Sequence, residues 1–160
     1  MKTQKFRFKT SEQEAIVNFN VEEFSFLNNA FPEKIVIQLD GIIFDNVETA
    51  YQAAKVTDPA VRKKISRMSL PEAKGFVTHP TTPCWKDVKY KIMFDLLWQK
   101  FYGNDYLKQK LLDTGDREIV KLNSSGDIYW GVCKIEDEYI GENNIGEILM
   151  NIRKKLRNLA

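Results

Sequence analysis

The stretch from Thr82 to Gly103 constrains the fold of this chain most. Thr82-Pro83 is typical of a helix start with proline in the first turn, and Gly103 is a helix stop. Between them, apolar side chains recur near the helical period: Trp85, Val88, Ile92, Met93, Leu96 and Leu97. This spacing predicts the longest helix of the chain, with one stripe that faces a hydrophobic core.

Shorter helices are predicted on both sides of it by their capping residues. Asp45 or Asn46 can cap a helix from Val47 to Val56, and Asp58-Pro59 begins the next one. Three more helices are expected: one after the capping-box sequence Ser69 to Glu72 with a stop at Gly75, one from Asp105 to Leu112, and one from Asn143 or Asn144 to Leu156.

Strands are few and come in pairs. A β-hairpin is predicted whose two strands, Lys34 to Leu39 and Ile42 to Phe44, are joined by the turn Asp40-Gly41. A second pair is expected from Glu118 to Leu122 and from Ile128 to Cys133. We therefore predict a single, mainly helical α+β domain over residues 1–160, because strands and helices do not alternate as in a parallel-sheet fold.

Composition narrows the range of sites and partners. The 24 basic and 22 acidic residues give a net charge of +2, which indicates neither a nucleic-acid nor a membrane partner. With one histidine, His79, and two cysteines, a multi-histidine or multi-cysteine metal site is hard to build, so we expect no metal. The chemistry considered for the site below requires no cofactor either. The absence of an apolar run of roughly 18 residues, together with the sparse cysteines, predicts a cytoplasmic protein without a membrane partner.

The first candidate site lies on the predicted helix that begins at Val47. Glu48, Tyr51, Gln52 and Lys55 stand at i, i+3, i+4 and i+7, so a carboxylate, a phenol, an amide and an amine share one face. The opposing interpretations are that Glu48 returns to the backbone as part of a capping box, or that the polar face is simply solvated.

Two further polar groups lie in the second half of the chain. Trp130, beside Asp127 and Gly131, offers a surface on which a base could stack, although a core tryptophan on a hairpin explains the same pattern. Asn143 precedes the last predicted helix, whose N–H groups could attract phosphate. An asparagine N-cap explains that residue without any ligand.

The order and spacing of these segments resemble the NADAR (YbiA-like) family from about Phe24 to Leu156. The resemblance rests on these segments: Phe26 to Pro32, Leu39 to Gly41, Val47 to Lys55, Glu72 to Lys74, Trp85, Lys100-Phe101, Thr114-Gly115, Asp127 with Trp130-Gly131, Gly141 to Gly146, Leu149-Met150 and Arg153. Two positions depart from the family pattern. Thr49 stands where many members have histidine, and Lys121 stands where many have glutamate.

The resemblance implies a helix-rich fold and an enzyme that cleaves the N-glycosidic bond of ribosylated bases. The substrates it implies are nucleotides or ADP-ribose adducts: phosphoribosylated pyrimidine intermediates of riboflavin synthesis, or ADP-ribosylated guanine in DNA or RNA. It assigns catalysis to Glu48 and Lys55, and substrate binding to Asn29, Tyr51, Gln52, Trp85, Asp127, Trp130, Gly131 and Asn143. Two alternatives are a module that binds ADP-ribose without cleaving it, and a helical interaction protein with a solvated polar face.

Overall fold

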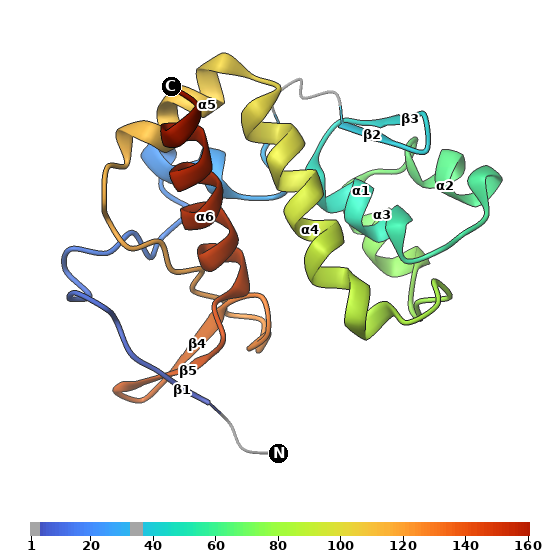
Figure 1. Cartoon of the computed structure of the whole chain (residues 1–160). Coiled ribbons are helices and arrows are strands. Elements are labelled where there is room, and N and C mark those ends of the chain that lie inside the picture. The colour runs from blue at the N-terminus through green and yellow to red at the C-terminus, as the bar shows by residue number, and fades with distance from the viewer. Residues whose placement is uncertain (1–3, 33–36) are drawn as a thin grey trace. The chain divides into compact units, whose positions relative to one another are not determined.

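The hairpin and helices predicted around Val47 belong to one of two compact units. The computed structural model describes residues 4–32 and 37–160 (Figure 1). One unit is formed by Asn29–Leu107, and the other by the chain up to Asn28 together with Lys108–Ala160. Each unit is described by itself.

The first unit begins with the predicted hairpin. β2 (Ile37–Leu39) pairs antiparallel with β3 (Ile42–Phe44). Asp40 and Gly41 between them have φ values of 51° and 78°, the pair of positive values that a tight two-residue hairpin turn requires. The hairpin prediction is confirmed, and its segment Lys34 to Val36 lies outside the described residues.

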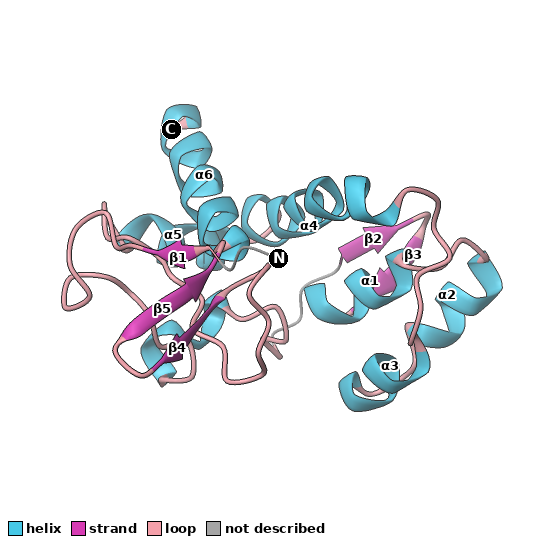
Figure 2. Ribbon diagram, turned by 90° about the horizontal axis from the view of Figure 1, so that it is seen from below, coloured by secondary structure: helices cyan, strands magenta, loops and turns pink. Residues whose placement is uncertain are grey.

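Three short helices follow the hairpin, as predicted: α1 (Val47–Ala54), α2 (Pro59–Ile65) and α3 (Leu70–Phe76). Each begins at a capping side chain that accepts a hydrogen bond from the first turn. The caps are Asn46, which accepts from the Thr49 N–H at 2.8 Å, Asp58, and Ser69 in a capping box with Glu72. α1 packs against both other helices and against the hairpin, so it is the central element of this unit (Figure 2).

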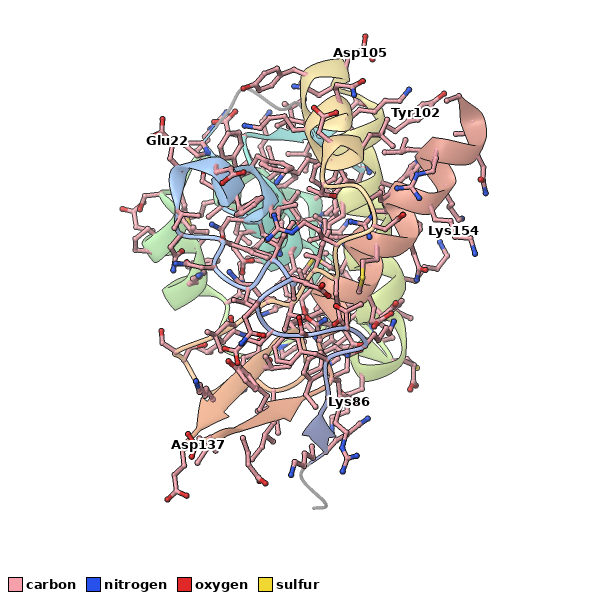
Figure 3. All side chains as sticks on the ribbon, turned by 90° about the vertical axis from the view of Figure 1, so that its left-hand side faces the viewer. Glu22, Lys86, Tyr102, Asp105, Asp137 and Lys154 are labelled. Carbon is pink, nitrogen blue, oxygen red and sulfur yellow. The ribbon has the colours of Figure 1, made fainter. Side chains whose placement is uncertain are left out.

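The long helix α4 (Trp85–Tyr102) ends before Gly103 as predicted, but it begins later than Thr82-Pro83. Thr82 has a different role, because its hydroxyl donates to the Ala54 carbonyl at 2.6 Å and its N–H donates to the Lys55 carbonyl at 3.0 Å. Thr82 therefore satisfies the carbonyls at the end of α1 instead of capping α4. Figure 3 labels Lys86 and Tyr102 near the two ends of α4.

The core of this unit lies where α4 meets α1. Met93, Leu96 and Leu97 of the predicted stripe are buried, whereas Trp85 and its neighbours Val88 and Ile92 are half-buried. α1 contributes mainly small side chains to this core: Ala50, Ala53 and Ala54. Small residues let two helix backbones approach closely, which holds the polar face of α1 in a fixed orientation.

The second unit contains an antiparallel sheet and the last helix. The sheet has the strand order β1 (Lys5–Phe6), β5 (Glu138–Gly141), β4 (Val132–Ile135), and Asp137 marks the β4–β5 turn in Figure 3. Three helical segments complete the chain: η1 (Glu22–Leu27), α6 (Asn144–Leu159) and α5 (Asp105–Asp113), within which the division between the units falls. The predicted class, mainly helical α+β with short paired strands, is confirmed.

The second predicted strand pair is wrong in its details. The strand starts at Val132 and not at Ile128, because the preceding residues turn around the Asp127 side chain. The stretch from Glu118 to Leu122 makes isolated parallel bridges, Ile119 with Ile16 and Leu122 with Val132, in place of a continuous strand. Within the residues that the structure describes, no helix has the length and apolar character needed to cross a membrane.

Candidate functional site

Glu48 lies half-buried in the first turn of α1. Its Oε1 accepts a hydrogen bond from Gln52 Nε2 at 3.0 Å, one turn further along the helix. The capping function belongs to Asn46, whose Oδ1 accepts from both the N–H and the hydroxyl of Thr49. The carboxylate of Glu48 is thus held by the Gln52 amide one turn further along, and the capping function at the start of α1 belongs to Asn46.

Two residues that contact Glu48, Asn29 and Gln52, each carry a buried side-chain amide oxygen. The Asn29 carbonyl accepts from the Glu48 N–H at 3.1 Å, and Asn29 Nδ2 lies 3.5 Å from Met93 Sδ. The side-chain oxygens Asn29 Oδ1 and Gln52 Oε1 are both buried and have no hydrogen-bond partner among the described residues. A buried acceptor without a partner is costly, so these two oxygens suit a ligand that brings its own hydroxyl or N–H donors.

Aromatic rings extend the same face of α1. The Tyr51 ring lies 5.3 Å from the Trp85 ring, centroid to centroid, at 46°. Lys55 Nζ lies 5.2 Å from the Tyr51 centroid, within the range of a cation–π contact. The predicted residues Asn29, Glu48, Tyr51, Gln52, Lys55 and Trp85 all belong to one unit, and these contacts link them into a single polar and aromatic face.

Burial lowers the pKa of the Lys55 amine below that of an ordinary lysine. The Glu48 carboxylate opposes this shift, while Lys89 and Lys74 add to it. A lysine with a lowered pKa is a better proton donor than an exposed one, and its neutral form is a better nucleophile.

The sequence motifs did not identify Lys74 and Lys89 as site residues. Lys74 stands in the last turn of α3, and Lys89 follows Trp85 by four residues on α4. The i, i+4 spacing from Trp85 was a usable signal for Lys89, because such residues share a helix face. Lys74 belongs to the Glu72 to Lys74 segment of the resemblance but has no such spacing to a site residue, because it belongs to α3, which reaches α1 only through packing.

Asp127 and Trp130 lie in the other unit, where they form a turn. Asp127 Oδ1 accepts from the Tyr129 and Trp130 N–H groups at 2.9 and 3.0 Å. The Trp130 ring is half-buried and lies edge to face with Tyr129 at a centroid distance of 4.7 Å. Trp130 is therefore not enclosed in the core, and its stacking role, like the sharing of one pocket by Asp127 and Glu48, stays a prediction.

Gly131 and Asn143 both lie against backbone groups of this unit. A side chain at Gly131 would overlap the Lys121 carbonyl, so the glycine permits close backbone approach within the protein. Asn143 is fully buried, and its amide accepts from the Lys121 N–H at 2.8 Å and donates to the Ile119 carbonyl at 2.9 Å. Both residues thus have a structural role inside this unit, and their assignment to substrate binding stays a prediction.

The backbone at the start of α6, where a phosphate was expected, is hydrogen-bonded inside the unit. The N–H groups of Asn143, Asn144 and Ile145 donate to the carbonyls of Gly131, Tyr129 and Trp130, respectively. A helix start attracts phosphate through N–H groups that have no other partner, and here these are used inside the unit.

Replacing Asn143 by alanine should destabilise the protein by about 2–4 kcal/mol, because two buried backbone groups would lose their partners. The φ of 55° at this position adds to the cost, since alanine tolerates that region less well than asparagine. Urea unfolding would measure the change. Asn151→Ala on the exposed side of α6 is the matched control, and equal effects of the two substitutions would contradict the role assigned to Asn143.

Both departures from the family pattern have structural partners. Thr49 is buried and its hydroxyl donates to Asn46 Oδ1 at 3.0 Å. Lys121 Nζ donates to Asn28 Oδ1 at 2.8 Å and lies 4.9 Å from the Phe19 ring centroid. Across residues 4–32 and 37–160, no group of three or more His, Cys, Asp or Glu side chains is arranged to hold a metal ion.

Comparison with known proteins agrees with the resemblance seen in the sequence. The model of the NADAR domain matches residues 5–157. The chain is 29% identical over 152 residues to the N-glycosidase YbiA of Escherichia coli, covering 90% of each protein. It is 31% identical over 144 residues to a riboflavin biosynthesis protein of Vibrio vulnificus, covering 87% of this chain but only 37% of that longer protein.

A solved structure supports the same relationship. The NMR structure of YbiA from Escherichia coli matches with a TM-score of 0.76 at 27% identity, over 99% of this chain and 95% of that one. The family model spans nearly the whole sequence, and the curated relative and the solved structure agree with it. The chain therefore belongs to the NADAR family.

Proposed function

We propose that this NADAR protein is an N-glycosidase that hydrolyses the bond between ribose C1′ and a ring or exocyclic nitrogen of a base. The observation that carries the proposal is the face of α1, where a half-buried carboxylate, Glu48, lies two turns before Lys55, an amine of lowered pKa. Relatives that bear the name N-glycosidase support the same reaction class.

Glu48 acts on the sugar in this proposal. As the C1′–N bond breaks, its electron pair leaves with the base nitrogen and positive charge develops at C1′ and the ring oxygen. A fixed carboxylate stabilises that charge and orients the water that supplies the hydroxyl to C1′. The Gln52 amide, which donates to Glu48 Oε1, holds the carboxylate in place.

Lys55 acts on the departing base. Its ammonium donates the proton that the base nitrogen needs, and the water that attacks C1′ restores a proton to the site, so hydrolysis adds one water across the bond. Tyr51 and Trp85 supply aromatic surface for the substrate. Asn29 Oδ1 and Gln52 Oε1 accept hydrogen bonds from the ribose hydroxyls or from the base.

The substrates that we propose are ribosylated bases, either phosphoribosylated aminopyrimidines or ADP-ribosylated guanine in nucleic acid. The name of the Vibrio vulnificus relative points to riboflavin synthesis for that protein and favours the first as a candidate for this one. Substrates of both classes suit a site that combines aromatic rings, acceptor oxygens and lysines.

The decisive experiment is a parallel assay of ADP-ribosylated guanine DNA, riboflavin-pathway aminopyrimidine phosphates and free NAD, with base release followed by chromatography. We expect base release from at least one of the ribosylated bases. Stabilisation by ADP-ribose without any base release would favour the binding module instead. The absence of both stabilisation and base release would favour the interaction protein. A specific ligand at roughly 100 times its Kd should otherwise stabilise the fold by about 2.7 kcal/mol.

A further inference from the structure

Gln52 carries a buried amide whose orientation is set by its neighbour on α1. The residue is only 6% exposed, and its Nε2 donates to Glu48 Oε1 at 3.0 Å. An ionised carboxylate can only accept hydrogen bonds, so the NH₂ end of the amide must face Glu48 and the oxygen must point elsewhere. The side chain of Gln52 therefore presents its oxygen, Oε1, as an acceptor for another group.

This oxygen has no hydrogen-bond partner among the described residues. A buried carbonyl oxygen without a donor is unfavourable, because it has lost its contact with water and gained no other bond. The helix cannot easily shift to relieve this, since the Asn29 carbonyl accepts from the Glu48 N–H at 3.1 Å one turn before Gln52. The unpaired oxygen of Gln52 indicates a ligand that brings its own donor.

Asn29 Oδ1 is also buried and unpaired, but the structure ties it less closely to the carboxylate. The contact between Asn29 and Glu48 joins two backbone groups, whereas the Gln52 amide contacts the carboxylate itself. Nε2 and Oε1 of Gln52 are bonded to the same carbon. Gln52 Oε1 is therefore separated from the contact with Glu48 by a single amide group.

The stereochemistry of a β-ribosyl base brings one hydroxyl to such an acceptor. The 2′-hydroxyl is carried by the carbon next to C1′, on the face of the sugar opposite to the base. Water that replaces the base by direct displacement approaches C1′ from that same face, so a carboxylate that orients this water lies beside the 2′-hydroxyl. Hydrogen bonds to this hydroxyl strengthen as positive charge develops at C1′, which makes the contact part of catalysis as well as of binding.

We propose that Gln52 Oε1 accepts a hydrogen bond from the 2′-hydroxyl of the substrate and makes the site specific for ribosyl over 2′-deoxyribosyl groups. The inference rests on the proposed N-glycosidase function and names the sugar that the site selects. A 2′-deoxyribosyl substrate would leave Oε1 buried and unpaired, which is how sites built to bond a hydroxyl reject analogues that lack it. The deoxyribonucleotides of DNA itself would then be poor substrates.

Titration calorimetry with ribose 5-phosphate and 2-deoxyribose 5-phosphate tests this recognition without turnover, because the two sugars differ only in the hydroxyl at C2. We expect the wild-type protein to bind ribose 5-phosphate at least about tenfold more tightly. Gln52→Met, with an unbranched apolar side chain, should bind the two sugars within about twofold of each other. Equal binding by the wild-type protein, binding of neither sugar, or a preference that survives in Gln52→Met would overturn the proposal.

Gln99→Met is the matched control within the same unit. The Gln99 side chain is half-buried, and its Oε1 accepts from the Gln38 N–H at 3.1 Å, so the same substitution removes an amide that already has a partner. This variant should keep the wild-type preference for ribose 5-phosphate. Gln52→Leu, a second apolar variant, should lose the preference as Gln52→Met does. The urea unfolding midpoint of both Gln52 variants should stay close to that of the wild type, because the oxygen they remove has no partner.

Turnover separates a contact with the 2′-hydroxyl from a purely positioning role of Gln52. The substrates are the aminopyrimidine ribonucleotide of the riboflavin pathway and its 2′-deoxy counterpart. The ratio of kcat/KM for the first to kcat/KM for the second should fall at least about tenfold in Gln52→Met, and the intrinsic reactivity of each sugar cancels in this comparison between variants. If Gln52 only held Glu48 in place, both values would fall by the same factor, and the proposal would be wrong. Absence of base release by the wild-type protein would refute the proposed function, while the calorimetry would still decide the preference for ribose.

Discussion

Replacing Glu48 by glutamine should reduce base release by about 100-fold or more while the protein still folds. Glutamine keeps the size of the side chain and an oxygen that can accept from Gln52 Nε2, but it removes the negative charge that stabilises C1′ in the transition state. Substrate affinity should change much less than the rate, because the lost interaction belongs mainly to the transition state. Steady-state kinetics and calorimetry on the same substrate measure the two quantities.

Asp45→Asn provides the control for this substitution. It removes a carboxylate three residues earlier in the chain, at an exposed position outside the site. Urea unfolding of both variants should differ from the wild type by no more than about 1 kcal/mol, the usual value of a charge near a helix start. Near-normal base release by Glu48→Gln would show that another residue performs the catalytic function.

The polar face of α1 could be predicted from the sequence because every residue involved belongs to one short helix or to its C-cap, Lys55. Periodicity alone places Glu48, Tyr51, Gln52 and Lys55 on a common face, and the structure confirms the helix that carries them. The capping residues Asp58 and Ser69 were equally local signals and are confirmed. Side-chain capping involves only neighbouring residues, so sequence patterns are enough to identify it.

The segment around Asp127 could not be predicted in the same way. Ile128 to Cys133 is rich in residues that favour strands, but the Asp127 side chain offers its oxygen to two backbone N–H groups and turns the chain instead. β5 was missed because it pairs with the distant strand β1 as well as with β4. Its position depends on tertiary pairing, which local composition does not encode.

Asn143 illustrates a different limit. The sequence indicated that Asn143 either caps the last helix or belongs to a phosphate site at its start. In both interpretations the residue acts at the start of its own helix. The structure gives it a positive φ and directs its amide to Ile119 and Lys121 instead. Gly146 completes this arrangement, since a side chain there would overlap the Ile119 carbonyl and the Asn143 amide. Contacts between segments more than 20 residues apart leave no periodic pattern in a single sequence.

Replacing Lys55 by methionine should also reduce base release by about 100-fold, the usual contribution of a positioned general acid. Methionine is unbranched and keeps most of the length of the apolar stem, so packing beside Tyr51 should survive. Trp85 contacts Tyr51 from α4, and that contact should also survive the substitution. Steady-state rates of base release measure the loss, and an unchanged unfolding midpoint shows that the fold is kept.

The pH dependence distinguishes the proton donor from a covalent role of the same amine. A general acid works only when protonated, so kcat/KM of the wild-type protein should fall as pH rises through the pKa of Lys55 in the free enzyme. Because burial and the neighbouring lysines lower that pKa, the fall should come at a lower pH than for an ordinary lysine. Lys55→Met should lose this alkaline limb.

A Schiff base between Lys55 and the opened sugar would require the neutral amine, and the rate would then rise with pH over the same interval. Sodium borohydride would reduce such an adduct by adding hydride to the C=N bond, leaving the ribosyl group attached to the Lys55 peptide in a mass spectrum. An alkaline fall in rate without a trapped adduct supports proton donation by Lys55. A rising limb with a trapped adduct would refute it and assign the amine to covalent catalysis.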